Sequence, residues 1–242
     1  MTRTESLRPT WAEIDLGAIR RNLECIRGLV NGGTGVLAVV KANAYGHGIT
    51  EVSRTLVDAG IDLLGVATVD EGIEIRKAGL DVPVLVMGSV LKGEARAAIE
   101  NHLTLTLCGP RMLRMLQDIS ERTGGRAKVH IEVDTGMGRI GLWHEEAFPF
   151  IKEAASSGYV DLEGVYTHFS SAARDKVFTS MQIERFEKVL SDTASAGIEV
   201  KYRHAANSVA VVDWKSSHMN LVRTGILLYG VYPKESFRKD FT

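Results

Sequence analysis

A lysine stands at the end of an apolar run near the start of the chain. Residues 36–40 are all apolar, and Lys41 follows them directly. An ammonium group at the end of a buried strand is unfavourable unless it has a partner or loses its charge. An uncharged lysine is a nucleophile that can condense with an aldehyde. The run alone also fits a lysine that reaches solvent from the strand end, so both interpretations stay open.

Further groups that could do chemistry occur at or just after the ends of other short apolar runs. They are Met87, Arg139, His168, His204 and Arg223. In a parallel barrel the active site forms at the carboxyl ends of the strands, so we expect these side chains to meet Lys41 there. Each histidine also fits a hydrogen-bonded core residue, and Arg223 also fits a surface ion pair.

The elements that must position these residues alternate along the chain, because short apolar runs are followed by longer helical patterns. This alternation favours βα units and a parallel sheet. The predicted strands are residues 36–41, 63–66, 84–87, 104–107, 128–133, 162–166, 200–204 and 221–223. The clearest predicted helices between them are residues 69–78, 92–101, 110–121, 145–156 and 178–196. Eight such strands predict an α/β protein with a (β/α)8 TIM-like barrel. A doubly wound open sheet is the alternative, and it usually has fewer strands.

The two ends of the chain depart from this alternation. Residues 8–14 fit a strand outside the eight, and Asp15 is expected to cap the first helix. Residues 233–242 are charged and lack periodicity, as expected of a linker or tail. We therefore predict an N-terminal strand within residues 1–13, the barrel over residues 14–232 and a linker or tail over residues 233–242.

Composition narrows the class of protein. The chain has 242 residues, which suits a single barrel, and its formal net charge is −1. No Lys/Arg run points to nucleic acid, and no apolar stretch approaches the roughly 20 residues of a membrane span. The N-terminal residues lack the apolar core of a secretory signal, so we expect a cytoplasmic protein. Cys25 and Cys108 form no metal or redox motif.

The residues around Lys41 resemble the alanine racemase family, in which the lysine of VVKANAYGHG carries the cofactor. Residues 39–48 read VVKANAYGHG in this chain. Further blocks resemble the family in the same order: WAEIDL at 11–16, VDTGMGRIG at 133–141, YTHF at 166–169, HAANS at 204–208 and RTGILLYG at 223–230. The resemblance extends over about residues 8–232. It implies a pyridoxal-phosphate enzyme of fold type III that interconverts L- and D-alanine. Such an enzyme would supply D-alanine for peptidoglycan precursors.

The resemblance also implies roles for individual residues. Lys41 would hold pyridoxal 5′-phosphate as a Schiff base and then act as a base on the α-carbon of the substrate. Arg223 would face the pyridine nitrogen, and a guanidinium cannot accept a proton from it. His204 would support Arg223, while His168 and Met87 would lie beside the cofactor. For both histidines, a core role remains the alternative.

The phosphate of the cofactor needs hydrogen-bond donors. The turn at Gly225 and Ile226, after the last strand, could offer backbone N–H groups. Ser208 is expected to cap the helix after the seventh strand and to donate its hydroxyl, beside Asn207 of the same block. Tyr45 could donate its phenol to the same phosphate.

Arg139 would reach the cofactor's phenolic oxygen and the substrate carboxylate, because its planar fork is permanently charged. In many family members a carbamylated lysine balances this arginine, and Glu132 occupies that position here. Glu132 carries a negative charge without needing carbon dioxide, so we expect it to orient Arg139. The alternative is that Glu132 faces a helix or solvent.

Family members continue past the barrel into a C-terminal β-domain. In the homodimer of the full-length family, that domain supplies a tyrosine as second base to the partner's site. We expect this chain to be the barrel domain alone, weak or inactive by itself, with its N-terminal strand paired in the missing domain and its dimerisation open. The alternative is a barrel-only pyridoxal-phosphate-binding protein of cofactor homeostasis; the MGRIG and HAANS blocks favour the racemase. A related amino-acid decarboxylase is a weaker third interpretation.

Overall fold

The computed structural model describes residues 10–239 and 241, and within them eight parallel strands form one curved sheet. The strand order is β8-β7-β5-β4-β3-β2-β1-β9. The strands are β1 Gly35–Val39, β2 Leu63–Val66, β3 Val84–Val86, β4 Thr104–Leu107, β5 Ala127–Asp134, β7 Val160–Tyr166, β8 Tyr202–His204 and β9 Leu221–Thr224. Each of the eight coincides with a predicted strand to within two residues at either end.

Backbone hydrogen bonds nearly close the sheet between its two ends. The Arg223 N–H of β9 donates to the carbonyl of Ala206 at 2.9 Å, just past the end of β8. The Asn220 N–H donates to the carbonyl of Arg203 at 3.3 Å. The sheet is therefore a nearly closed barrel, which confirms the (β/α)8 prediction and rules out an open doubly wound sheet.

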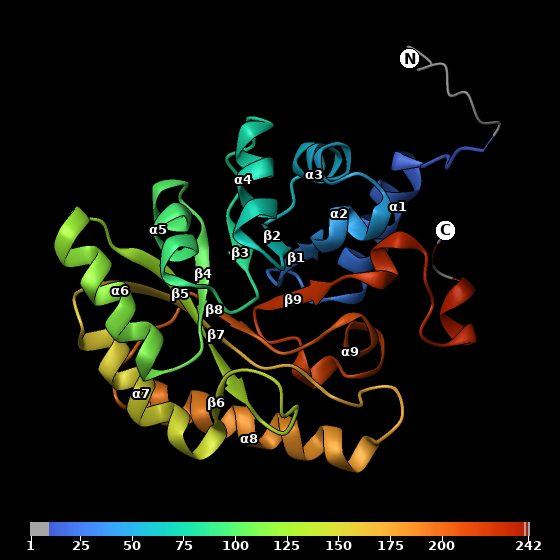
Figure 1. Cartoon of the computed structure of the whole chain (residues 1–242). Helices are drawn as coiled ribbons and strands as arrows, with labels where there is room; N and C mark the ends of the chain where they lie inside the picture. Colours follow the sequence, from blue (N-terminus) through green and yellow to red (C-terminus); the bar gives the residue numbers. More distant parts are fainter. Residues whose placement is uncertain (1–9, 240, 242) are drawn as a thin grey trace.

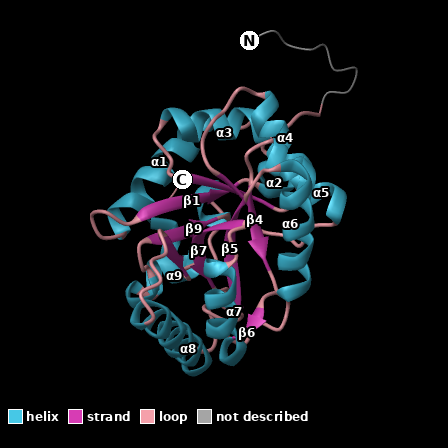
Figure 2. Cartoon of the chain, turned by 90° about the vertical axis from the view of Figure 1, so that its left-hand side faces the viewer, coloured by secondary structure: helices cyan, strands magenta, loops and turns pink. Residues whose placement is uncertain are grey.

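Helices surround the strands on the outside, as Figures 1 and 2 show. The regular helices are α1 Leu16–Leu29, α3 Ile49–Asp58, α4 Val69–Lys77, α5 Lys92–Glu100, α6 Pro110–Thr123, α7 His144–Ser156, α8 Lys176–Ser195 and α9 Ser208–Asp213. Asp15 caps α1 as predicted, because its carboxylate accepts the Ala18 N–H at 2.9 Å. In the described part of the chain, no helix combines the length and the apolar character that a membrane span requires.

Two layers of apolar side chains hold the barrel together. Along β1, Val36 and Ala38 pack against the helices, whereas Leu37 and Val39 point into the barrel. This division follows from the two-residue period of a strand. Inside the barrel, the side chains of Leu37 and Val39 join Leu63, Leu85 and Leu221. The interior is thus filled rather than hollow, apart from its mouth.

The structure differs from the sequence-based expectation in three peripheral places. A short strand, β6 (Leu142–Trp143), pairs with the end of β5 at a place where no strand was predicted. Residues 10–14 form no strand, and the rest of that predicted strand lies outside the described residues. Residues 235–239 form a 3-10 helix, and Phe237 and Phe241 are buried against the core rather than part of a free tail.

Candidate active site

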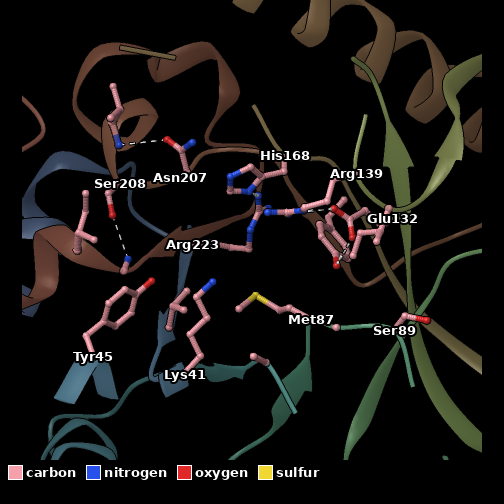
Figure 3. A pocket seen from close by; sticks show the side chains of 18 residues that line it. Lys41, Tyr45, Met87, Ser89, Glu132, Arg139, His168, Asn207, Ser208 and Arg223 are labelled. Atoms are coloured by element: carbon pink, nitrogen blue, oxygen red, sulfur yellow. Dashed lines mark hydrogen bonds and ion pairs between the residues drawn. The ribbon is translucent and has the colours of Figure 1, made fainter. Parts of the chain in front are cut away.

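A cavity of about 540 Å³ opens at the carboxyl ends of the barrel strands. It brings together the sequence-predicted residues Lys41, Tyr45, Met87, Glu132, Arg139, His168, Asn207, Ser208, Arg223, Gly225 and Ile226. Figure 3 shows Lys41 between Tyr45 and Met87, with its amine directed toward Arg223. Of the predicted site residues, His204 alone does not line the cavity.

The backbone after Lys41 makes an unusual turn. Lys41 begins α2 (Lys41–Gly46), yet residues 42–45 are left-handed, with φ of 52–53°. For L-residues this conformation costs roughly 1–2 kcal/mol each, because Cβ approaches the following carbonyl oxygen. Tyr229 supports the turn: its ring lies 5.0 Å from that of Tyr45, and its hydroxyl donates to the carbonyl of Val39 at 3.0 Å. The sequence did not predict this turn.

Arg223 is the buried cation at the centre of the site. Its Nη1 donates to His204 Nδ1 and to the His204 carbonyl, both at 3.0 Å. Its Nη2 donates to the carbonyls of Thr167 and Ala205, at 2.7 and 3.1 Å. Burial lowers the pKa of Arg223 to about 10, so it stays charged at neutral pH. Among the residues that the structure describes, none accepts a hydrogen bond from its Nε–H, which leaves that donor for a molecule in the cavity.

Arg223 fixes the protonation of the histidines behind it. A guanidinium only donates, so His204 Nδ1 must be the unprotonated ring nitrogen. His204 Nε2 then carries a hydrogen and donates it to His130 Nδ1, 2.9 Å away. Burial, assisted by the positive charge of Arg223, lowers the pKa of His130 to about 3 and that of His204 well below its usual value. Both rings are therefore neutral.

His168 lies on the cavity side of Arg223. Its Nδ1 is 3.4 Å from Arg223 Nη2 and faces a donor, so it is also unprotonated. Burial first, and then the charges of Arg223, Arg139 and Lys41, lower the pKa of His168 to about 3. A neutral imidazole with its Nε2–H available can donate to a ligand without adding charge.

Glu132 points into the cavity and is 2% exposed, which excludes the alternative in which it faces a helix or solvent. Tyr166 donates its hydroxyl to Glu132 Oε2 at 2.9 Å. Arg139 Nη2 lies 3.9 Å from Glu132 Oε1, and the Arg139 side chain is half-exposed. Burial raises the pKa of Glu132 to about 7, although Tyr166, Arg223 and Arg139 each act to lower it.

The end of the cavity away from Glu132 and Arg139 is polar and is lined by Tyr45, Ser208 and Gly225. The Ser208 hydroxyl accepts the Gly225 N–H at 3.0 Å, so its own hydrogen remains free to donate. Asn207, not Ser208, caps α9, because its side chain accepts the N–H groups of Val209 and Ala210. The prediction for the Ser208 cap was therefore wrong, and the Gly225 N–H is already engaged. A Cβ at Gly225 would lie 2.9 Å from the Tyr45 hydroxyl, so a larger residue there would displace that phenol.

Two residues of this network were not assigned from the sequence. Tyr166 connects Glu132 to the interior and stacks on His204 with a ring separation of 4.7 Å. His130 receives the hydrogen bond of His204, 74 positions away in the chain. Tyr166 belonged to a recognised block and was within reach of sequence reasoning. The His130 pair forms only when the barrel closes, so no local signal indicated it.

The arrangement can bind a planar anionic molecule that carries an aldehyde. Lys41 supplies an amine, and Arg223 and His168 supply donors around the middle of the cavity. Tyr45 and Ser208 supply hydroxyl donors at one end, and Arg139 supplies a charged fork at the other. The described residues contain no cluster of three or more His, Cys, Asp or Glu side chains that could hold a metal ion.

Comparison with known proteins agrees with this geometry. Residues 14–233 match the family model described as alanine racemase, N-terminal domain. The alanine racemase of Methanococcus maripaludis is 44% identical over 96% of this chain and 63% of its own length. That of Desulforamulus reducens is 42% identical over 96% of this chain and 63% of its own length.

Solved structures give the same result. The alanine racemase of Clostridium difficile in complex with cycloserine superposes with a TM-score of 0.93 at 35% identity, over 98% of this chain and 66% of that one. The alanine racemase of Bacillus anthracis with bound L-Ala-P superposes with a TM-score of 0.86 at 35% identity, over 98% of this chain and 61% of that one. The chain thus spans slightly less than two thirds of the length of these relatives.

Proposed function

This chain belongs to the alanine racemase N-terminal domain family, and we propose that it binds pyridoxal 5′-phosphate through Lys41 for the racemisation of alanine. The observation that carries the proposal is the convergence of Lys41, Arg223 and the Tyr45–Ser208 end on one cavity. Because the chain covers only part of the length of its relatives, the activity, the substrate and a homodimeric assembly are all part of the proposal.

The residues present fit this cofactor. The unused Nε–H of Arg223 would face the pyridine nitrogen and keep it unprotonated, since arginine cannot accept a proton. The space beside Gly225 would take the phosphate, with donors from Tyr45 and Ser208. When bound, pyridoxal phosphate supplies the electron sink that stabilises negative charge on the substrate's α-carbon.

The protein's own groups would bind and move protons around that carbon. Lys41 Nζ would hold the cofactor and, once released from it, take or return the α-proton on its own face. Arg139 would bind the substrate carboxylate, and the nearby Glu132 would limit the directions that Arg139 adopts. Inversion needs a second base on the opposite face, and none of the residues described around the cavity is assigned that role. We therefore propose that this chain contributes one of the two bases.

The first test is covalent. The protein is incubated with pyridoxal phosphate, its visible absorption is recorded, and borohydride then fixes the link for peptide mass mapping. We expect a visible band and a label on Lys41, both absent in Lys41→Ala. Lys152→Ala removes an exposed lysine of α7 and should keep both. A label on another residue, or a band that survives in Lys41→Ala, would overturn the assignment.

The second test separates racemase chemistry from cofactor homeostasis. The loaded protein is given L-alanine in D2O, and deuterium at the α-carbon is measured together with D-alanine. Exchange with little D-alanine is the expected result for one base acting on one face. A bound cofactor without any exchange would favour the homeostasis alternative.

A further inference from the structure

The turn after Lys41 is held by a carboxylate from a different βα unit. Glu71 is the third residue of α4, and its Oε1 accepts the Ala42 N–H at 2.6 Å. That N–H belongs to the peptide bond between Lys41 and Ala42. The other oxygen, Oε2, accepts the N–H groups of Ala67 and Thr68, at 2.7 and 3.2 Å. One side chain therefore ties the loop after β1 to the loop after β2.

Helix capping by itself does not require the contact with Ala42. In α4, Thr68 and Glu71 form a capping box, which engages only one oxygen of the carboxylate. In α5, Glu94 stands at the same helix position and its Oε2 accepts the Leu91 N–H at 2.6 Å. Over the described stretches, the Glu94 side chain makes no other hydrogen bond. The second oxygen of Glu71 thus serves the Lys41–Ala42 peptide and not its own helix.

The peptide that Glu71 holds is the entry to the strained turn. Residues 42–45 are left-handed, and strained backbone persists only where its surroundings hold it in place. Further along the turn, Asn43 Oδ1 accepts the Ile49 N–H at 2.8 Å. The Ala42 amide lies near the surface, so water could replace the carboxylate as acceptor. Water, however, has no attachment to the β2 loop and could not fix the orientation of the peptide.

We propose that Glu71 is a positioning residue for Lys41. Its carboxylate fixes the plane of the Lys41–Ala42 peptide and so directs the Lys41 side chain into the cavity. This proposal rests on the proposed role of Lys41 as the amine that binds the cofactor. Glu71→Gln keeps the shape of the side chain but has one acceptor oxygen. Its amide nitrogen would face either the Ala42 N–H or the two N–H groups of the β2 loop, and both arrangements place donor against donor.

The first experiment needs no cofactor. Hydrogen exchange of the peptide covering residues 41–48 is measured in the wild type, in Glu71→Gln and in Glu94→Gln. The last is the matched control, because it alters the same capping position on another helix. We expect exchange about tenfold faster in Glu71→Gln alone, the factor that loss of a hydrogen bond to a charged group commonly produces. Unchanged exchange in Glu71→Gln would overturn the proposal.

The second experiment reads the Lys41 amine directly. The same three proteins are mixed with pyridoxal phosphate and the rise of the visible band is timed. We expect the band to form about tenfold more slowly in Glu71→Gln and to be nearly unchanged in Glu94→Gln. Equal rates in all three would overturn the positioning role even if exchange had increased. If the wild type gave no band, the proposed function would be wrong, and exchange alone would decide whether Glu71 holds the turn.

Discussion

The interior of the barrel has an aliphatic half and a polar half. The aliphatic half is formed by Leu37 of β1, Leu63 of β2 and Leu85 of β3, each at most 1% exposed. The polar half is formed by side chains of β5, β7, β8 and β9 that are each at most 4% exposed: His130, Glu132, Tyr166, His204 and Arg223. The same barrel thus buries two kinds of surface under different physical constraints.

The difference lies in what each half requires of its neighbours. An aliphatic side chain gains stability from burial alone, in proportion to the area removed from water. A buried polar group must find a partner. Here some partners belong to the same set, as Tyr166 with Glu132 and Arg223 with His204, and others are backbone carbonyls, which accept from Arg223. The series of hydrogen bonds that runs from Arg223 through His204 ends at the His130 ring. His130 Nε2 has no hydrogen-bond partner among the residues that the structure describes. The hydrogen bonds of the polar half therefore fix which of its ring nitrogens carry hydrogen, whereas the burial of the aliphatic half stabilises the fold.

The largest effect on stability is expected in the aliphatic half. Leu85→Ala removes a fully buried side chain and leaves a cavity, which should lower the free energy of unfolding by about 4 kcal/mol. The visible band with pyridoxal phosphate should still form under folding conditions, because Leu85 does not line the site. Urea denaturation and the absorption titration test the two statements. A variant that keeps its stability but loses the band would contradict this division of the barrel.

The same division explains how much the sequence could predict. The strands and their chemistry-bearing ends were predictable, because apolar runs of strand length and helical periods are local signals. Lys41 and Arg223 stand at the ends of such runs, and Arg139 lies in the loop after another, so topology alone brings them to one mouth of the barrel. Recognition of the family blocks then added Tyr45, Asn207 and Ser208, which carry no strong local signal of their own.

The features that the sequence could not predict depend on contacts that form only when the barrel closes, or on which of two neighbouring residues takes a given role. The left-handed turn over residues 42–45 contradicts the intrinsic preference of its Ala and Tyr residues, and Glu71 from another unit accepts the hydrogen bond of its first N–H. Asn207 and Ser208 are both good capping residues, and only the observed geometry decides between them. The charged, aperiodic composition of residues 233–242 gave no indication that Phe237 and Phe241 pack onto the core.

A smaller effect, dependent on pH, is expected in the polar half. Burial raises the pKa of Glu132 from 4.5 to about 7, so the folded protein holds this proton to higher pH than the unfolded chain. Stability should therefore fall as pH rises from about 4.5 to about 7, by up to about 3 kcal/mol. Glu132→Gln removes this dependence and should be the more stable protein at pH 8.

Urea denaturation at several pH values tests this prediction. The control is Glu153→Gln, which changes an exposed carboxylate of α7 and should keep the slope of the wild type. Parallel pH profiles for the wild type and Glu132→Gln would show that Glu132 is charged at neutral pH. In that case its interaction with Arg139 would be stronger than the distance of 3.9 Å indicates.

The smallest effect on stability is expected at the rim of the polar half. Arg139 is half-exposed and 3.9 Å from Glu132, so Arg139→Gln should change the free energy of unfolding by less than about 1 kcal/mol. Its proposed partner is the substrate, so the affinity of the loaded protein for alanine should fall about tenfold, as for a lost charged hydrogen bond. Spectral titration with alanine measures this, with the exposed Arg174→Gln as control. An intact affinity together with a large loss of stability would make Arg139 a part of the fold, and the boundary between the two halves would then lie elsewhere.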